Sequence, residues 1–296
     1  MKLYAPKYYN SFKCIAGACE HSCCIGWEID IDEKALEKYK SLKYGYGATI
    51  ANTIDTEETP HFILDCGERC PHLDENGLCK IIINLGEEYL CDICREHPRF
   101  YNFSSNAYLG IGMSCPEAAR VILSFPDYST FEKIGETNAV CDGIEFDGFD
   151  ECKKIYIILG DNAQDYIDRL EKIYHSYKVN ADDDKNWLQR LDTLEYLNEE
   201  HKKLFLKYSY KLRPKEKESK EYLQRFLAYL IYRHTIEAID MDDFCVRLSF
   251  CLFCERLLSS LICTENAKML GDVSKLASII SEEIEYSSDN TFSLMC

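Results

Sequence analysis

The stretch FKCIAGACEHSCCIGW, residues 12–27, contains four cysteines within eleven residues and two glycines, Gly17 and Gly26. The glycines allow the backbone to bend, so the four sulfur atoms can converge on one small volume. Metal–sulfur bonds of roughly 2.3 Å make this convergence favourable only when an ion or a cluster lies at its centre. The stretch therefore predicts a metal-binding region with an irregular backbone.

Two further cysteine blocks follow. The segment CPHLDENGLC, residues 70–79, predicts a turn at Asn76-Gly77 that brings Cys79 back beside Cys70. The segment CDICREHPRF, residues 91–100, adds a CxxC pair with two arginines nearby, and positive charge favours thiolates. Both segments extend the set of candidate metal ligands.

Cys115 completes this set, because it directly precedes Pro116. Proline suits the first position of a helix, and the following residues AARVIL continue a helix well. We expect Cys115 at the positive end of this helix, where a thiolate is favoured over a thiol.

The cysteine count indicates metal binding rather than disulfides. Ten of the 17 cysteines lie in the first 115 residues, far above ordinary usage. The sequence begins without the apolar segment of a signal peptide, so we expect a cytoplasmic protein whose thiols stay reduced. Eight thiolates could hold two zinc ions and four could hold a 4Fe–4S cluster, and the spacing alone leaves both open.

The composition of the whole chain excludes several classes of protein. Its 296 residues are 46% hydrophobic and 29% charged, which is typical of a globular chain with one large core or two smaller ones. With 34 Lys and Arg against 51 Asp and Glu, the net charge of −17 repels polyanions and argues against nucleic acid as a partner. The most apolar stretch, residues 245–263, is interrupted by charges, so we expect no membrane-spanning segment and no membrane partner.

Helical periodicity dominates the second half of the chain. In the irregular first part, Asp32 is expected to cap one helix that ends near Gly45. Apolar residues then recur at helical spacing in segments 163–174, 187–197, 222–239, 244–261 and 267–284. We therefore expect a mainly α fold, with a cysteine-rich metal-cluster domain over residues 1–125, an acidic linker over 126–150 and an α-helical bundle over 151–296.

The helix expected over residues 222–239 carries a candidate binding face. Arg225, Tyr229 and Arg233 recur every four residues and so share one exposed side. Two arginines on one side could hold a carboxylate or an acidic patch, whereas a solvated face with internal salt bridges is the alternative. Cys251 and Cys254 have apolar neighbours and are expected in the core.

These motifs together resemble a known family. The segments CPHLDENGLC and CREHPRF are similar to those of zinc- or iron-chelating cysteine-cluster proteins, and within that group the chain resembles flagellin lysine-N-methylase. The resemblance is dense over residues 1–125 and returns at 222–239. It is carried by MKLYAPKYYNSFKC, CCIGWEIDID, NLGEEYLCDICREHPRF, SCPEAARVIL and YLQRFLAYLIYRH.

The resemblance implies a cytoplasmic protein-lysine N-methyltransferase of the bacterial flagellum, which modifies surface lysines of flagellin with S-adenosylmethionine as donor. It also implies an iron–sulfur cluster, with 4Fe–4S favoured and zinc as the alternative. The ligands carried over from the family are Cys14, Cys19, Cys23, Cys24, Cys70, Cys79, Cys94 and Cys115, whereas Cys66 and Cys91 lie outside its pattern. Arg225, Tyr229 and Arg233 would then bind the donor, and no residue is assigned as the catalytic base.

Two common donor-binding patterns are missing from the sequence. No strand leads through a glycine-rich turn into a helix, and the CxxxCxxC spacing of radical enzymes fails because Gly26 occupies its third position. A second function therefore stays open, namely a non-catalytic protein that binds an iron or zinc cluster and uses its helical half as a docking domain.

Overall fold

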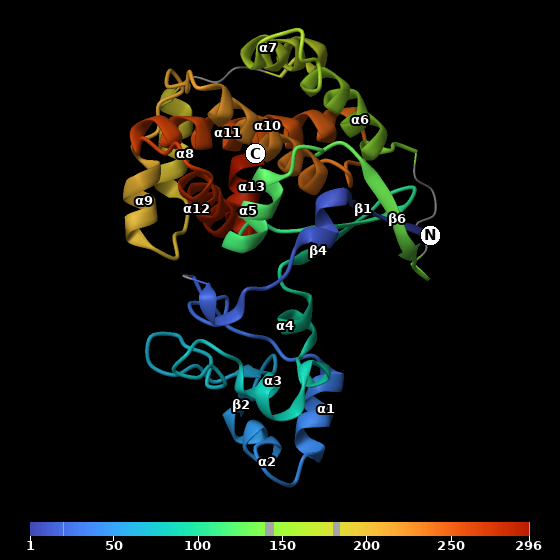
Figure 1. Ribbon diagram of the computed structural model, residues 1–296, viewed down its shortest axis with the longest axis vertical. Coiled ribbons are helices and arrows are strands. Elements are labelled where there is room, and N and C mark those ends of the chain that lie inside the picture. Colours follow the sequence, from blue (N-terminus) through green and yellow to red (C-terminus); the bar gives the residue numbers. More distant parts are fainter. Residues whose placement is uncertain (20, 140–144, 180–183, 296) are drawn as a thin grey trace. The chain divides into compact units, whose positions relative to one another are not determined.

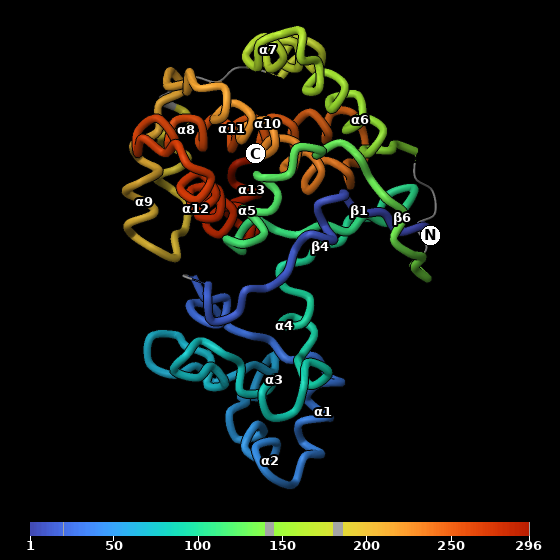
Figure 2. Tube along the Cα trace, in the orientation of Figure 1, coloured from blue at the N-terminus to red at the C-terminus, as the bar shows by residue number. Residues whose placement is uncertain are grey.

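The computed structural model describes residues 1–19, 21–139, 145–179 and 184–295 (Figure 1). The chain forms two compact units. The small unit, Lys13–Arg99, is inserted into the large unit, which consists of Met1–Phe12 and Phe100–Cys296. Figure 2 traces the chain out of the large unit after its first strand and back into that unit for the later strands. These boundaries differ from the division expected at residues 125 and 150.

A four-stranded sheet in the large unit explains this difference. Its strands are β1 (Lys2–Pro6), β4 (Arg99–Phe103), β5 (Ala107–Ile111) and β6 (Phe131–Glu136), in the order β4-β5-β1-β6. Strand β1 is parallel to β5 and antiparallel to β6. The first residues of the chain therefore belong with the large unit, and β6 lies in the segment expected as an acidic linker. Residues 140–144 of that expected linker lie outside the described residues.

Helices form most of the large unit, which confirms the mainly α fold class. Helix α5 (Pro116–Ser124) begins at the expected proline, with Cys115 as its N-cap residue. Two long helices, α10 (Lys217–His234) and α11 (Met241–Thr264), pack against each other. The remaining elements are η1 (Lys7–Ser11), α6 (Gly148–Leu159), α7 (Tyr166–Tyr177), α8 (Asp184–Thr193), α9 (Glu199–Phe205), α12 (Leu270–Ile280), the π-helical turn η5 (Ser281–Glu285) and α13 (Ser288–Met295).

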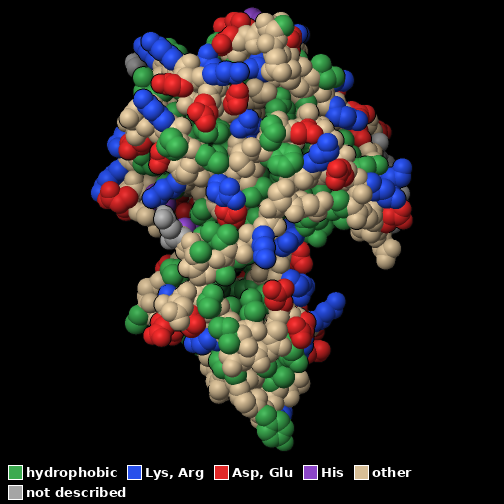
Figure 3. All heavy atoms as spheres, in the orientation of Figure 1, with side chains coloured by type: hydrophobic (Ala, Val, Ile, Leu, Met, Phe, Trp, Pro, Cys, Tyr) green, Lys and Arg blue, Asp and Glu red, His purple; other side chains and the backbone are tan. Residues whose placement is uncertain are grey.

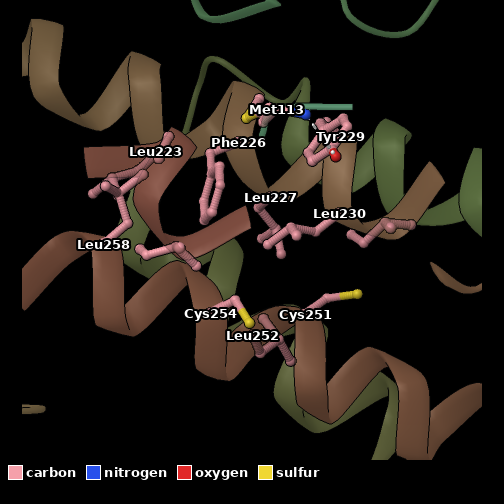
Figure 4. Close-up of a cluster of buried hydrophobic side chains, with 14 of the residues drawn as sticks. Met113, Leu223, Phe226, Leu227, Tyr229, Leu230, Cys251, Leu252, Cys254 and Leu258 are labelled. Atoms are coloured by element: carbon pink, nitrogen blue, oxygen red, sulfur yellow. Dashed lines mark hydrogen bonds between the residues drawn. The ribbon is translucent and has the colours of Figure 1, made fainter. Parts of the chain in front are cut away.

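The core of the large unit lies between α10 and α11. Figure 4 shows Phe226 and Leu227 of α10 opposite Cys251, Cys254 and Leu258 of α11. Both cysteines are 0% exposed, which confirms the prediction that they belong to the core. Burial of such side chains stabilises a fold by about 1.5–3 kcal/mol each, so this helix pair supplies much of the stability of the unit.

One buried charge on α11 is neutralised by a neighbour. The side chain of Glu255 is fully buried, and its two carboxylate oxygens lie 2.7 and 2.8 Å from Nη1 of Arg213. The hydroxyl of Tyr166 donates a further hydrogen bond at 3.1 Å. Removal of one partner from a buried ion pair is strongly destabilising, so Arg213 and Glu255 depend on each other inside the unit.

The small unit contains short helices and little sheet. Its elements are η2 (Ala16–Ala18), α1 (Glu33–Ser41), α2 (Gly47–Ile50), η3 (Ala51–Thr53), β2 (Ile54–Asp55), β3 (His61–Phe62), α3 (Lys80–Leu85), η4 (Glu87–Tyr89) and α4 (Asp92–Glu96). The helix expected after Asp32 is confirmed, because Oδ1 of Asp32 accepts the amide of Ala35 at 3.0 Å. Its Oδ2 accepts the amide of Asp92 at 2.7 Å, so one carboxylate caps both α1 and α4.

The surface of the large unit carries both signs of charge. Figure 3 shows acidic and basic side chains interspersed over the visible face of this unit. Across the part of the chain that the structure describes, no helix has the length and apolar character needed to span a bilayer.

Candidate metal-binding and ligand-binding sites

Five cysteines of the small unit lie within electrostatic range of one another, and we call them the cysteine group. They are Cys24, Cys70, Cys79, Cys91 and Cys94. The thiol of Cys94 donates a hydrogen bond to the sulfur of Cys91. Four of the five belong to the ligand set that the family resemblance implies, and Cys91 is the addition.

Local backbone structure gathers the group from three segments. The carbonyl of Cys24 accepts the amide of Cys70 at 2.8 Å, which joins the first block to the second. The expected turn in the second block is confirmed, because Cys79 pairs with Leu73 across it and Gly77 takes a φ of +73°. A side chain would strain the backbone at that φ, so glycine permits the turn.

The loop around Gly17 packs against this turn. A Cβ atom on Gly17 would lie 2.5 Å from the carbonyl oxygen of Asn76, so only glycine allows this approach. The cysteines on either side make local contacts. The sulfur of Cys14 accepts the amide of Ala16 at 3.4 Å, and the thiol of Cys19 donates to the carbonyl of His21 at 2.9 Å.

Thiol acidity differs among members of the cysteine group. A hydrogen bond from Cys23 lowers the pKa of Cys24 to about 7, and the hydrogen bond from Cys94 lowers the pKa of Cys91. Burial raises the pKa of Cys70 to about 12. The hydrogen bond that Cys94 gives to Cys91 raises the pKa of Cys94 itself. Neighbouring thiolates repel one another, and a metal cation among them would allow all five sulfurs to ionise together.

The donor set fits a soft metal in its chemistry. Iron–sulfur clusters and zinc are held by cysteine thiolates, and these five thiols come from one compact unit. Among the described residues, no three His, Cys, Asp or Glu side chains already stand in the geometry of a metal site. His72 is occupied structurally, since its two ring nitrogens lie 2.7 Å from the Tyr46 hydroxyl and 3.0 Å from the Thr53 hydroxyl.

The other cysteines among the first 115 residues are not members of the cysteine group, although Cys23 hydrogen-bonds to Cys24. Cys14, Cys23 and Cys66 are exposed. Cys115 belongs to the large unit, where it is the N-cap residue of α5. Cys91 is 1% exposed and lies outside the ligand set that the resemblance implies, although its CxxC spacing with Cys94, one turn along α4, is a local signal that the two thiols lie together.

A cavity of about 410 Å³ in the large unit is a second candidate site. Its volume is typical of a small-molecule site, roughly 300–1,000 Å³, and its walls combine aromatic and charged groups. The lining residues come from β4 and its flank, from the end of α10, from η5 and from α13. They are Phe100, Asn102, Arg233, His234, Glu285, Ser288, Thr291, Phe292 and Met295.

Glu285 is the centre of a hydrogen-bonded network in this cavity. Its side chain is 0% exposed, and its Oε2 lies 2.7 Å from Nε2 of His234 and 3.2 Å from Nε of Arg233. The hydroxyl of Tyr229 donates to the same oxygen at 3.1 Å. Burial would raise the pKa of Glu285, but Arg233 and His234 outweigh it and hold that pKa below the usual value. Glu285 is therefore a carboxylate.

Arg233 is held in a fixed orientation by this network and by two rings. Its guanidinium lies 4.8 Å from the ring centroid of Phe100 and 4.7 Å from that of Tyr286. Its Nη1 donates to the hydroxyl of Tyr229 at 3.1 Å. The side chain is 12% exposed and lines the cavity, so its positive charge lies beside any anion bound there.

The two arginines of the expected binding face of α10 line different cavities. Arg225 lines a different cavity of about 510 Å³, where its Nη1 donates to the carbonyl of Leu123 at 2.8 Å. Tyr229 lies between the two arginines and is 2% exposed. The expectation that this side of the helix is exposed is therefore wrong, and the two arginines do not line one site. Glu285 could not be found from the sequence pattern, because it lies 52 residues beyond Arg233.

Curated bacterial proteins are similar to part of this chain. A lysine-N-methylase of Salmonella typhimurium is 31% identical over 137 residues, which is 41% of this chain and 32% of that protein. The flagellar biosynthetic protein FliU of Salmonella muenchen is 29% identical over 130 residues, which is 41% of this chain and 77% of that protein. A lysine-N-methylase of Salmonella choleraesuis is 31% identical over 130 residues, again 41% of this chain and 32% of that protein.

The chain thus spans about a third of the length of these two lysine-N-methylases. No family profile and no solved structure matches it. The resemblance predicted from the motifs is nevertheless confirmed: over about two fifths of its length, this chain is similar to lysine-N-methylases and to a flagellar biosynthetic protein.

Proposed function

We propose that this protein is a protein-lysine N-methyltransferase that modifies flagellin with S-adenosylmethionine as methyl donor. The similarity to proteins named lysine-N-methylase, over 130 to 137 residues, is the observation that carries the proposal. The name of the third relative, a flagellar biosynthetic protein, supports flagellin as the substrate. The acidic net charge of −17 suits a lysine-bearing protein surface and predicts association that weakens with salt.

The cavity of the large unit is the proposed donor site. S-adenosylmethionine has a carboxylate, a positive sulfonium and a flat purine. The positive charge of Arg233 suits the carboxylate, and the rings of Phe100 and Phe292 suit the cation and the purine. Tyr229 acts behind Arg233 as a positioning residue. Arg225 lines the other cavity and has no part in this proposal.

The cysteine group is the proposed metal site. Cys24, Cys70, Cys79, Cys91 and Cys94 would supply thiolates to an iron–sulfur cluster, or to zinc as the alternative. Such a metal, when bound, supplies positive charge among the thiolates and cross-links the segments that carry them.

The second function, a non-catalytic cluster-binding protein, has one observation in its favour. The cysteine group lies in a compact unit of its own, whereas the cavity lies wholly in the other unit. A metal carrier would need only the small unit, whereas a methyltransferase needs the cavity as well.

Methyl transfer to flagellin separates these functions. The protein, purified without oxygen and with its metal, is incubated with flagellin and methyl-labelled S-adenosylmethionine, and lysine label is located by mass spectrometry. We expect label on surface lysines. A metal-loaded protein that neither binds the donor nor labels flagellin would favour the cluster-binding function.

A matched pair of arginine variants tests the donor site. Arg233→Lys retains a charge beside Glu285 but loses the planar fork, so we expect donor affinity to fall about tenfold by calorimetry. Arg120→Leu is the control, because Arg120 is half exposed on α5 and pairs only locally with Glu117. Equal donor affinity in both variants would remove the cavity from the proposal.

A further inference from the structure

We propose that His234, held by Glu285, takes the proton from the substrate lysine before methyl transfer. This inference rests on the proposed function and assigns its missing catalytic base. It concerns the cavity of the large unit and does not depend on the cysteine group.

A lysine methyltransferase needs a proton acceptor. A lysine in water has a pKa of about 10.4, so its amine is almost fully protonated near neutral pH and has no lone pair for attack. An acceptor must line the substrate site, and its own pKa must lie near the working pH.

The titratable groups around the cavity leave one such acceptor. Arg233 is permanently protonated, and its charge is engaged by Glu285. Burial raises the pKa of Tyr229 well above the usual value, and its hydroxyl proton is donated to Glu285. Glu285 has no exposed side-chain surface and already accepts from three side chains, which makes its carboxylate a weak base. His234 is the group that remains.

The contact with Glu285 fixes the tautomer of His234. Its Nε2 lies 2.7 Å from a carboxylate oxygen, so Nε2 carries the hydrogen and Nδ1 carries the free lone pair. Among the described residues, Nδ1 has no hydrogen-bond partner. Phe250 of α11 packs edge-on against the ring at 5.0 Å and limits its rotation. A carboxylate that orients an imidazole in this way also stabilises the imidazolium that forms when the ring accepts a proton.

The surrounding charges keep the ring neutral until it reacts. Burial lowers the pKa of His234, and Glu285 opposes this effect. Arg233, on the same helix, and Arg247, on α11, lower it further. The buried thiols of Cys251 and Cys254 also face Glu285 from α11. Near neutral pH the ring is therefore unprotonated and able to accept a proton.

Helix α13 provides an apolar approach to this base. Ser288 is followed at three and four residues by Thr291 and Phe292, and Met295 follows these two at four and three residues, so all four share one side of the helix and line the cavity. Phe292 is 69% exposed. Its ring and the side chain of Met295 suit the methylene groups of a lysine side chain whose amine points at His234.

The proposed step is balanced. The lysine ammonium passes one proton to Nδ1 of His234, and the freed lone pair attacks the methyl carbon of the sulfonium. The new N–C bond forms as the C–S bond breaks, and the electron pair of that bond stays on sulfur as a neutral thioether. The product is a methylammonium, and His234 then releases its proton to solvent, so each methyl transfer yields one proton.

His234→Gln tests the step. The glutamine amide can keep the hydrogen bond to Glu285, but it cannot accept the proton. At neutral pH we expect turnover to fall about 100-fold or more, with donor affinity unchanged. The wild-type rate should level off above the pKa of His234, whereas the variant rate should keep rising with pH toward that of free lysine, about 10.4.

A second histidine–carboxylate pair offers a matched control. His201 Nδ1 lies 2.6 Å from the buried carboxylate of Glu283, outside the cavity lining. His201→Asn should therefore leave turnover and pH profile as in the wild type. If the wild type transfers methyl groups and His234→Gln does so with the wild-type rate and profile, the inference is wrong and the proposed function stands. If the wild type transfers none, the proposed function itself fails.

Arg247→Gln provides a second test that leaves the ring in place. Removal of this positive charge should raise the pKa of His234, so the acid limb of the pH–rate profile should move to higher pH. An acid limb that stays at the wild-type position in a folded Arg247→Gln protein would contradict the role of His234.

Discussion

The small unit and the large unit of this chain are ordered in different ways. In the large unit, α10 and α11 bury most of their side chains against neighbouring helices. The small unit, in the residues described, has a core of ten buried apolar residues, and two of these, Cys70 and Cys91, belong to the cysteine group. A small core gives little net stability. The large unit is therefore ordered mainly by helix packing, whereas the small unit has few apolar contacts and two of its ten core residues are cysteines.

Loss of one thiolate from the cysteine group should reduce stability more than either of the two changes described after it. Cys24→Ser or Cys91→Ser replaces a soft thiolate by a hydroxyl, so we expect lower metal content and fast amide exchange across residues 13–99. The exchange pattern of the large unit should not change. Structural metal sites contribute on the order of 10 kcal/mol to folding, enough to unfold this unit.

Cys66→Ser is the control for these variants, because Cys66 is exposed in the same unit and lies outside the group. Chelation of the wild type should reproduce the effect of Cys24→Ser. If metal content and amide exchange were the same in Cys24→Ser, Cys91→Ser and Cys66→Ser, the order of the small unit would not depend on a metal held by the cysteine group.

Loss of the Arg213 charge should have the next largest effect, confined to the large unit. Arg213→Met leaves the carboxylate of Glu255 buried without its cation, so we expect the free energy of unfolding to fall by about 3–5 kcal/mol. The double variant Arg213→Met/Glu255→Leu removes both charges and should regain most of this loss. Denaturant unfolding followed by far-ultraviolet circular dichroism measures the free energy of unfolding of the single and the double variant. A loss below ~1 kcal/mol in the single variant would mean that the ion pair is not needed for stability.

Loss of the shared helix cap should have the smallest effect, within the small unit. Asp32→Ala removes the acceptor for α1 and α4, and we expect a loss of about 1–2 kcal/mol. Asp32→Asn keeps an acceptor and should lose less. Burial raises the pKa of Asp32, but the amides of Asp92 and Ala35 outweigh it and lower that pKa in the folded protein. The wild-type cap is therefore weakened as the pH falls below about 3.8, whereas the Asn cap should show no such dependence.

Features that depend on neighbouring residues could be predicted from the sequence. The helix after Asp32, the helix at Pro116 and the turn near Gly77 are all confirmed, because caps, proline and glycine act within a few residues. The burial of Cys251 and Cys254 followed from their apolar surroundings. Four of the five members of the cysteine group were predicted to lie together, because they occur in short cysteine-rich segments of the sequence.

Features that depend on distant partners could not be predicted. Strand β6 has charged residues at half of its positions and lies in an acidic segment, and it is a strand because β1 pairs with it from more than 120 residues away. The five residues of β5 are all buried, so they lack the alternation that marks a strand. Glu285 has no motif around it, and only the fold brings it to Arg233 and His234.

The position of β1 has a consequence for the order in which the protein is made. A ribosome releases residues 2–6 before the small unit, whereas their hydrogen-bonding partners in β5 and β6 emerge only after the whole small unit has been synthesised. The small unit is continuous in sequence and can fold as soon as it has been synthesised, while β1 still has an unpaired edge. A nascent chain in which the small unit folds slowly therefore exposes an incomplete small unit and an unpaired β1 edge at the same time.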